Sequence, residues 1–256
     1  MPVTLSLENK VALITGGSRG IGAAAVRMFA AAGAKVVFNY QKAQAAAEQI
    51  VKDLGPQHCA AFAADLARPE NAAALVASAI KTFGRLDMLV ANHGIWESAD
   101  VPIDQMNESQ WQRTLAINLE SVFMLLKHSV AQMKKQGQGG HIVLVSSTAG
   151  QRGEALHCDY AASKGAIISM VKGLSTELAK DGIYVNCVAP GWVETDMAAP
   201  ALNNPVTREK VFATIPLRRV GKPEELAAPI LFLCTPHAGF ITGEIFNVNG
   251  GAVLVG

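Results

Sequence analysis

The most constraining feature of this sequence is a regular alternation of short apolar runs with longer alanine-rich segments. The apolar runs have strand length and lie at 10–15, 34–39, 58–65, 86–92, 141–147, 183–189 and 244–249. Runs with so few polar residues are typical of strands in a parallel sheet covered on both faces. The segments between them have helical length and lie at 21–32, 43–54, 69–83, 105–136, 160–181 and 224–235. The alternation predicts a Rossmann-type α/β fold, a doubly wound parallel sheet of about seven strands with helices on both faces.

Length and composition limit the classes of protein that fit this pattern. With 256 residues, of which 50% are hydrophobic and 17% charged, we expect a single domain over 1–256. The formal net charge of +1 argues against a broad basic surface for nucleic acid. We find neither the roughly 20 uninterrupted apolar residues of a membrane span nor a secretory signal in residues 1–9. The four cysteines form no C-x-x-C pair and no histidines show metal-ligand spacing, so we expect no disulfide, no metal and a cytoplasmic location.

One segment, 196–221, departs from the alternation. It contains Pro200, Pro205 and Pro216, an Asn-Asn pair and one short helical stretch near 207–214. Long irregular insertions in compact domains are usually functional loops. We therefore expect this segment to be a substrate loop, with a disordered surface excursion as the alternative.

A glycine-rich turn follows the first predicted strand and opens the first predicted helix, with the sequence Thr-Gly-Gly-Ser-Arg-Gly-Ile-Gly over 15–22. Glycines permit a tight turn and let backbone N–H groups approach a pyrophosphate at the positive end of the helix. The turn predicts a dinucleotide site. The residues expected to contact the cofactor here are Gly16, Ser18, Arg19, Gly20, Ile21 and Gly22.

The end of the second predicted strand indicates which dinucleotide is preferred. NAD-binding folds carry an acidic residue there for the ribose hydroxyls, whereas this strand ends Asn39-Tyr40-Gln41-Lys42. Arg19 and Lys42 are placed to hold a 2′-phosphate, which a guanidinium binds in bidentate fashion. We expect NADP(H), with Asn39 among its contacts and NAD(H) as the alternative. Arg19 as a solvated turn residue is the competing interpretation.

A Tyr-x-x-x-Lys pair formed by Tyr160 and Lys164 opens the predicted helix 160–181, and Ser147 lies upstream at the end of the fifth predicted strand. Residues four apart lie on one helix face, so the ammonium should stand near the phenol. A neighbouring cation favours phenolate and would lower the tyrosine pKa from about 10. A serine hydroxyl can stabilise the developing charge on a substrate oxygen. The set predicts acid/base chemistry on a carbonyl or an alcohol.

Together these motifs make the whole chain resemble the short-chain dehydrogenase/reductase family. The resemblance implies hydride transfer between a nicotinamide and a ketone or aldehyde and its alcohol, with a catalytic tetrad of Asn118, Ser147, Tyr160 and Lys164. Asn118 would hold a proton-relaying water, and Lys164 would also bind the nicotinamide ribose. The remaining cofactor contacts that it implies are Asp65, Leu66, Asn92, Gly94, Pro190, Gly191, Val193 and Thr195. Members similar to this chain commonly form homotetramers, which we therefore expect.

One position departs from the family pattern. Where Asn-Ala-Gly is usual, the sequence has Asn92-His93-Gly94. We interpret His93 as a tolerated packing change, with a catalytic or pH-sensing role as the alternative, because histidine titrates near neutrality.

The substrate is less well defined than the reaction. Trp96 and Trp192 are placed to line the substrate side and suit an apolar or ring-shaped molecule. The scaffold motifs are most similar to 3-oxoacyl-[acyl-carrier-protein] reductases, but Asp181 would repel an acidic carrier protein, so that partner is not favoured. An NAD-dependent alcohol or sugar dehydrogenase is a further alternative. A non-catalytic dinucleotide sensor is the rival class, although it would have no need of the tetrad.

Overall fold

The computed structural model describes residues 5–255. We expected no secretory signal in residues 1–9, and the first four of these lie outside the described residues. Parallel strands within this range form one seven-stranded sheet in the order β3-β2-β1-β4-β5-β6-β7. The strands are β1 (Val11–Ile14), β2 (Lys35–Tyr40), β3 (Cys59–Ala63), β4 (Met88–Ala91), β5 (Gly140–Val145), β6 (Ile183–Pro190) and β7 (Ile245–Val248). The predicted Rossmann-type sheet is confirmed.

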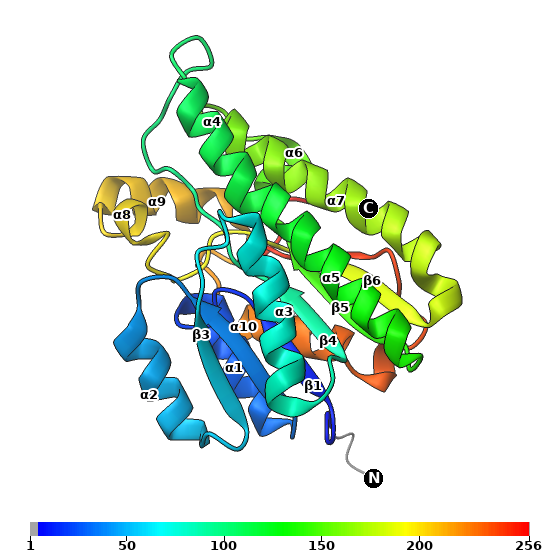
Figure 1. Cartoon of the computed structure of the whole chain (residues 1–256). Helices are drawn as coiled ribbons and strands as arrows, with labels where there is room; N and C mark the ends of the chain where they lie inside the picture. The colour runs from blue at the N-terminus through cyan, green and yellow to red at the C-terminus, as the bar shows by residue number, and fades with distance from the viewer. Residues whose placement is uncertain (1–4, 256) are drawn as a thin grey trace.

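Helices cover both faces of the sheet, as Figure 1 shows. On one face pack α1 (Gly20–Ala31), α2 (Gln44–Leu54) and α10 (Pro223–Leu233). On the other pack α3 (Pro69–Phe83), α5 (Ser121–Gln136) and α7 (Cys158–Leu178). Successive strand residues serve opposite faces, since Ala12 and Ile14 join the first core and Leu13 joins the second. Burial on both sides explains why these strands have nearly continuous apolar sequences.

The long predicted helix 105–136 is interrupted in the structure. It begins with α4 (Glu108–Leu115), passes through a π-helical turn η1 (Ala116–Glu120) and continues as α5. Asn118 lies within η1 and is fully buried. A π-helical turn inserts an extra residue into the helix and often marks a functional site. Sequence periodicity extends across this interruption, which is why a single helix was expected.

The segments around Ser147 and 196–221 also differ from expectation. β5 ends at Val145, and Ser147 is the N-cap of a short helix α6 (Thr148–Arg152), with its Oγ accepting a hydrogen bond from the Ala149 N–H. The substrate-loop segment contains two helices, α8 (Ala199–Leu202) and α9 (Pro205–Thr214), where one was expected. Both lie above the carboxyl edge of the sheet in Figure 1. Short 3-10 turns, η2 (Ala179–Asp181) and η3 (Pro236–Ala238), follow α7 and α10.

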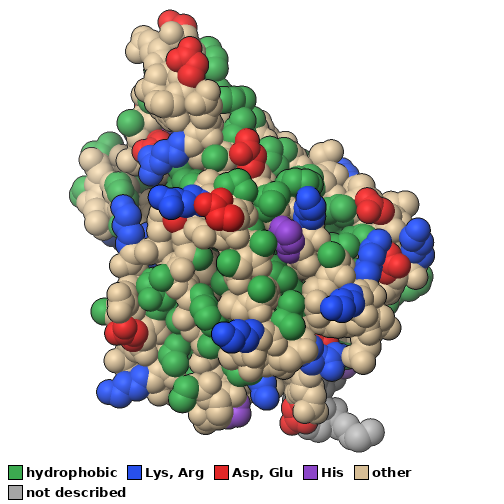
Figure 2. Space-filling model, in the orientation of Figure 1, with side chains coloured by type: hydrophobic (Ala, Val, Ile, Leu, Met, Phe, Trp, Pro, Cys, Tyr) green, Lys and Arg blue, Asp and Glu red, His purple; other side chains and the backbone are tan. Residues whose placement is uncertain are grey.

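The surface carries mixed charge on the face drawn in Figure 2, where Lys and Arg side chains alternate with Asp and Glu. Within residues 5–255, no helix combines the length and apolar character that crossing a membrane would require.

Candidate active site

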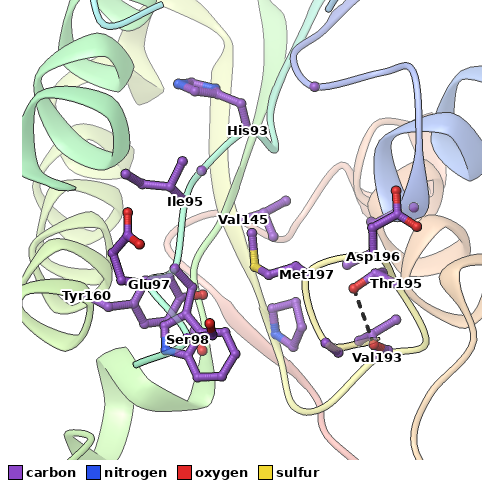
Figure 3. A pocket seen from close by; sticks show the side chains of 18 of the residues that line it. His93, Ile95, Glu97, Ser98, Val145, Tyr160, Val193, Thr195, Asp196 and Met197 are labelled. Carbon is purple, nitrogen blue, oxygen red and sulfur yellow. Dashed lines mark hydrogen bonds between the residues drawn. The ribbon is translucent and has the colours of Figure 1, made fainter. Parts of the chain in front are cut away.

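A cleft of about 1370 Å³ opens at the carboxyl ends of the strands, where the sheet order reverses between β1 and β4. Ligands of open α/β sheets bind at this switch point. Figure 3 shows Tyr160 and Glu97 on one wall, with Val193, Thr195 and Asp196 on the other. Most of the predicted site residues line this cleft: Gly16, Ser18, Arg19, Gly20, Ile21, Asn39, Asp65, Leu66, Asn92, Gly94, Trp96, Ser147, Tyr160, Lys164, Pro190, Gly191, Trp192, Val193 and Thr195.

The glycine turn has the backbone that an anion cradle needs. Gly16 and Gly20 adopt φ of +65° and +53°, which side-chain-bearing residues rarely adopt. A Cβ on Gly22 would overlap the carbonyl oxygen of Gly16, so this position must stay small for α1 to meet the turn. Among the described residues, none caps the N-terminus of α1 with a side chain, and its first turn carries no acidic residue. These free N–H groups at a positive helix end fit the pyrophosphate of a dinucleotide.

Asn39, which lines the cleft, also holds the glycine turn in place. Its Oδ1 accepts a hydrogen bond from the Gly16 N–H at 2.9 Å, and its Nδ2 donates to the Ala64 carbonyl at 3.1 Å. The amide thus fixes the glycine turn against the end of β3. Asn39 is buried, and its polar atoms are occupied by the protein itself.

Arg19 points toward the loop that follows β6. Its guanidinium lies 3.4 Å from the Asp196 carboxylate, and the two side chains are 70% and 71% exposed. Such an exposed ion pair contributes little free energy, so the guanidinium is available to a phosphate. Lys42 also lines the cleft.

The residues predicted to perform acid/base chemistry come from two parts of the chain that hydrogen bonds between side chains and backbone hold together. Tyr160 and Lys164 lie on the first turns of α7, and Lys164 Nζ is 5.8 Å from the centre of the Tyr160 ring. Lys164 is buried, and its Nζ donates a hydrogen bond to the Val145 carbonyl at 2.9 Å. Ser146 Oγ donates to the Lys164 carbonyl at 2.7 Å, which ties the end of β5 to α7. Ser147 is thereby held beside the tyrosine.

The electrostatics of this group differ from the prediction. Burial raises the pKa of Tyr160, a hydrogen bond with Ser147 partly offsets the rise, and the nearby Glu154 carboxylate adds to it. The expected lowering by Lys164 is therefore wrong for the cofactor-free protein. Burial also lowers the pKa of Lys164 to about 8. The charge of Lys164 is not among the causes of the shift in the pKa of Tyr160.

Asn118 lies beneath the cleft instead of lining it. Its Oδ1 accepts from the Ile95 N–H at 2.8 Å, and its Nδ2 donates to the Ile95 carbonyl at 2.9 Å. A Cβ on Gly94 would lie 3.2 Å from Asn118 Oδ1 and 3.4 Å from Lys164 Nζ. The side chain of Asn118 therefore shapes the loop after β4 that borders Lys164.

His93 connects the glycine turn to the interrupted helix. Its Nδ1 lies 2.7 Å from Thr15 Oγ1 and its Nε2 lies 2.6 Å from Ser121 Oγ, which in turn donates to the Ile117 carbonyl. Burial, together with the charge of Lys164, lowers the pKa of His93 to about 3. A neutral imidazole through the physiological range argues against the pH-sensing alternative. The contacts support a packing role, in which His93 links two parts of the site.

Sequence reasoning missed several residues that build the site. Asp159 is buried beside Tyr160 and accepts hydrogen bonds from Thr114 Oγ1 at 2.7 Å and Gln110 Nε2 at 3.2 Å, which fixes α7 against α4. Gly150 lets α6 approach α7 closely. Their proximity to Tyr160 and Ser147 in sequence was the available signal. Among residues 5–255, no group of three His, Cys, Asp or Glu side chains is arranged to hold a metal.

Comparisons with known proteins agree with this geometry. Residues 16–253 match the family described as Enoyl-(Acyl carrier protein) reductase. The chain is 38% identical to 3-oxoacyl-[acyl-carrier-protein] reductase FabG of Vibrio cholerae, over 98% of this chain and 100% of that protein. It is similar to the crystal structure of Short-chain dehydrogenase/reductase SDR:Glucose/ribitol dehydrogenase from Brucella melitensis, with a TM-score of 0.90, 36% identity and coverage of 99% and 100% of the two chains. It also resembles 3-ketoacyl-(acyl-carrier-protein) reductase from Brucella melitensis complexed with NADH, with a TM-score of 0.89, 33% identity and coverage of 97% and 100%.

Proposed function

Because the chain belongs to the short-chain dehydrogenase/reductase family and is an oxidoreductase acting on keto or CH–OH groups with NAD(P), we propose that Tyr160 is its acid/base and NADP(H) its preferred cofactor. The observation that carries the proposal is the placement of Ser147, Tyr160 and Lys164 in one cleft with the glycine turn. Consumption of NADPH that depends on both the enzyme and a ketone tests the activity. NADPH binding without turnover of any carbonyl or alcohol would favour the sensor alternative.

In this proposal the protein supplies geometry and proton transfer. The nicotinamide, when bound, supplies the hydride in reduction and accepts it in oxidation. Tyr160 holds its proton at neutral pH because a phenol ordinarily has a pKa of about 10 and burial raises it further, and it gives that proton to the carbonyl oxygen as the alkoxide develops. The Ser147 hydroxyl orients this oxygen by hydrogen bonding. The Lys164 ammonium opposes the negative charge left on the phenol.

In this proposal, the preference for NADPH over NADH depends on the Arg19 guanidinium. Arg19→Ala should lower the ratio of kcat/KM for NADPH to that for NADH by about 10- to 100-fold, since charge-assisted hydrogen bonds to the 2′-phosphate are lost. Initial rates with each cofactor at a fixed ketone concentration measure the ratio. Arg27→Ala is the matched control, because Arg27 lies on α1, the helix that Arg19 precedes, and pairs with Asp53 at 2.7 Å. An unchanged ratio in Arg19→Ala would contradict the assignment.

The pKa of Lys164 gives a pH dependence with a defined sign. A lysine whose pKa is about 8 is charged below that pH and loses its charge as the pH rises through it. We expect kcat/KM for NADPH in the reductive direction to be level near neutrality and to fall above about pH 8, because this parameter reports the free enzyme. Initial rates measured over a series of buffered pH values give kcat/KM for NADPH at each pH and check this expectation. A profile that stayed level to about pH 10 would show that the ammonium is retained or unnecessary.

Reduction of a 3-oxoacyl group on a carrier protein is a second candidate, supported by the names of several relatives. The charge beside η2 does not favour it, because Asp181 pairs with Lys134 at 2.9 Å and so neutralises a lysine that an acidic partner would use.

We further propose a homotetramer, which is supported by exposed apolar side chains such as Phe123 on α5 and Phe240 after η3.

A further inference from the structure

Three aromatic side chains meet in the substrate half of the cleft. The Trp96 ring lies 5.8 Å from that of Trp192 at 87°, and 5.1 Å from that of His157 at 53°. We call these three residues the aromatic box. All three line the same cleft as Tyr160, and they come from three separate segments, after β4, after β6 and before α7. Only the Trp96–Trp192 pair is edge-to-face, and both indoles line the cleft, so a further ring can pack against them.

Contacts between two loops hold the aromatic box in place. His157 is buried, and its Nε2 lies 3.2 Å from the Asp100 carboxylate. The Val101 N–H donates to the Leu156 carbonyl at 3.1 Å. Leu156 has φ of +67°, a left-handed conformation that costs free energy for leucine and persists because its surroundings enforce it. A box fixed in this way loses little conformational entropy when a rigid ligand binds.

Charged side chains near the aromatic box are already paired. Arg113 lies 2.6 Å from Glu97, and Arg152 lies 2.7 Å from Glu154, and all four line the cleft. The two arginines are balanced by the two carboxylates, so this part of the cleft has no net positive charge to attract an anionic substrate. The Lys164 ammonium is buried and donates one of its hydrogen bonds to the Val145 carbonyl. The arrangement therefore favours an uncharged substrate.

We propose that the aromatic box selects uncharged ketones whose carbonyl is carried on or beside a ring, together with the corresponding alcohols. This inference rests on the proposed function and deepens it. In reduction, a bound NADPH would supply hydride to the carbonyl carbon as the C=O π bond opens, and Tyr160 would give its proton to the oxygen, leaving NADP⁺ and a Tyr160 phenolate that is reprotonated from solvent. A flat or puckered ring fills the space against Trp96 without freezing rotatable bonds, whereas an open chain must freeze several.

The test compares two uncharged ketones of equal carbon number, 4-tert-butylcyclohexanone and 2-decanone, with the anionic 5-oxodecanoate and an acetoacetyl thioester. Wild-type kcat/KM with NADPH should be highest for the ring ketone. Trp96→Ala should lower that value on the order of 10- to 100-fold and change the value for 2-decanone by less than about 3-fold. Trp96→Phe keeps a ring face and should restore most of the loss.

Trp111→Ala is the matched control. Trp111 lies on α4 and is not among the described residues that line the cleft. It should leave both ketones unaffected. An equal fall for both ketones in Trp96→Ala, with no rescue by Phe, would mean that Trp96 is only structural and would overturn the inference. A wild-type preference for 5-oxodecanoate, 2-decanone or the thioester would also overturn it while leaving the reductase assignment intact. Failure to reduce any of the four, despite NADPH binding, would instead count against the proposed function.

Discussion

Tyr160→Phe is expected to lower turnover on the order of 10³-fold while leaving the affinity for NADPH close to that of the wild type. The substitution removes one hydroxyl and keeps the ring, so the packing at the start of α7 is retained. Without the phenol, the developing alkoxide has no proton donor in the position that Ser147 and Lys164 border. Steady-state rates and NADPH fluorescence titration measure the two quantities separately.

Tyr184→Phe provides the matched control for that substitution. Tyr184 lies on β6 and stacks on His141 at 5.0 Å, and neither residue lines the cleft among the described residues. The control should keep its full rate. A Tyr160→Phe variant with near-normal turnover would overturn the assignment of the acid/base, and a large loss of NADPH affinity would point to a binding role instead.

The second large effect is expected at Gly150, where α6 touches α7. A Cβ at this position would lie 2.5 Å from the Lys164 carbonyl carbon and 2.8 Å from the Gly165 nitrogen, so backbone would have to move. Gly150→Ala should push Ser147 away from Tyr160 and lower kcat on the order of 100-fold, because small misplacements of a reacting group are costly. We also expect a loss of about 1 to 3 kcal/mol in the free energy of unfolding.

Gly173→Ala is the control for the glycine substitution, because Gly173 lies on α7 and an added Cβ there finds no heavy atom of the described residues within 4 Å. Alanine in a helix is favoured over glycine by about 1 kcal/mol, so this variant should unfold at a higher temperature and keep its rate. Thermal melting and kcat of the two variants settle the comparison. A fully active Gly150→Ala enzyme would show that the contact between α6 and α7 tolerates adjustment.

The sheet was predictable from the sequence because burial on both faces imposes a pattern that each strand shows by itself. Strand ends and helix starts near the site were not, because polar contacts between distant segments decide them. Ser147 ends up capping α6 because its Oγ finds the Ala149 N–H. Asn118 sits in a π-helical turn while its amide binds Ile95, a partner 23 residues away in sequence.

The prediction of a lowered pKa for Tyr160 failed for a related reason. Spacing alone places Lys164 near Tyr160, but it does not reveal that Nζ is bonded to the Val145 carbonyl and buried. Burial then dominates the pKa of both groups, raising that of the phenol and lowering that of the ammonium. Likewise, the absence of a carboxylate after β2 was visible in the sequence, whereas the Asp196 carboxylate that meets Arg19 comes from a remote loop.

The strand order also bears on how the chain folds as it leaves the ribosome. Among the described strands, β1 and β4 are the neighbours that are not consecutive in sequence, joined by pairs such as Ala12 with Met88. Each later strand can then dock beside the one made just before it. Until β4 emerges, one side of β1 is an open edge that can pair with another nascent chain. The interval between the synthesis of β1 and that of β4 is therefore when pairing between nascent chains is most expected.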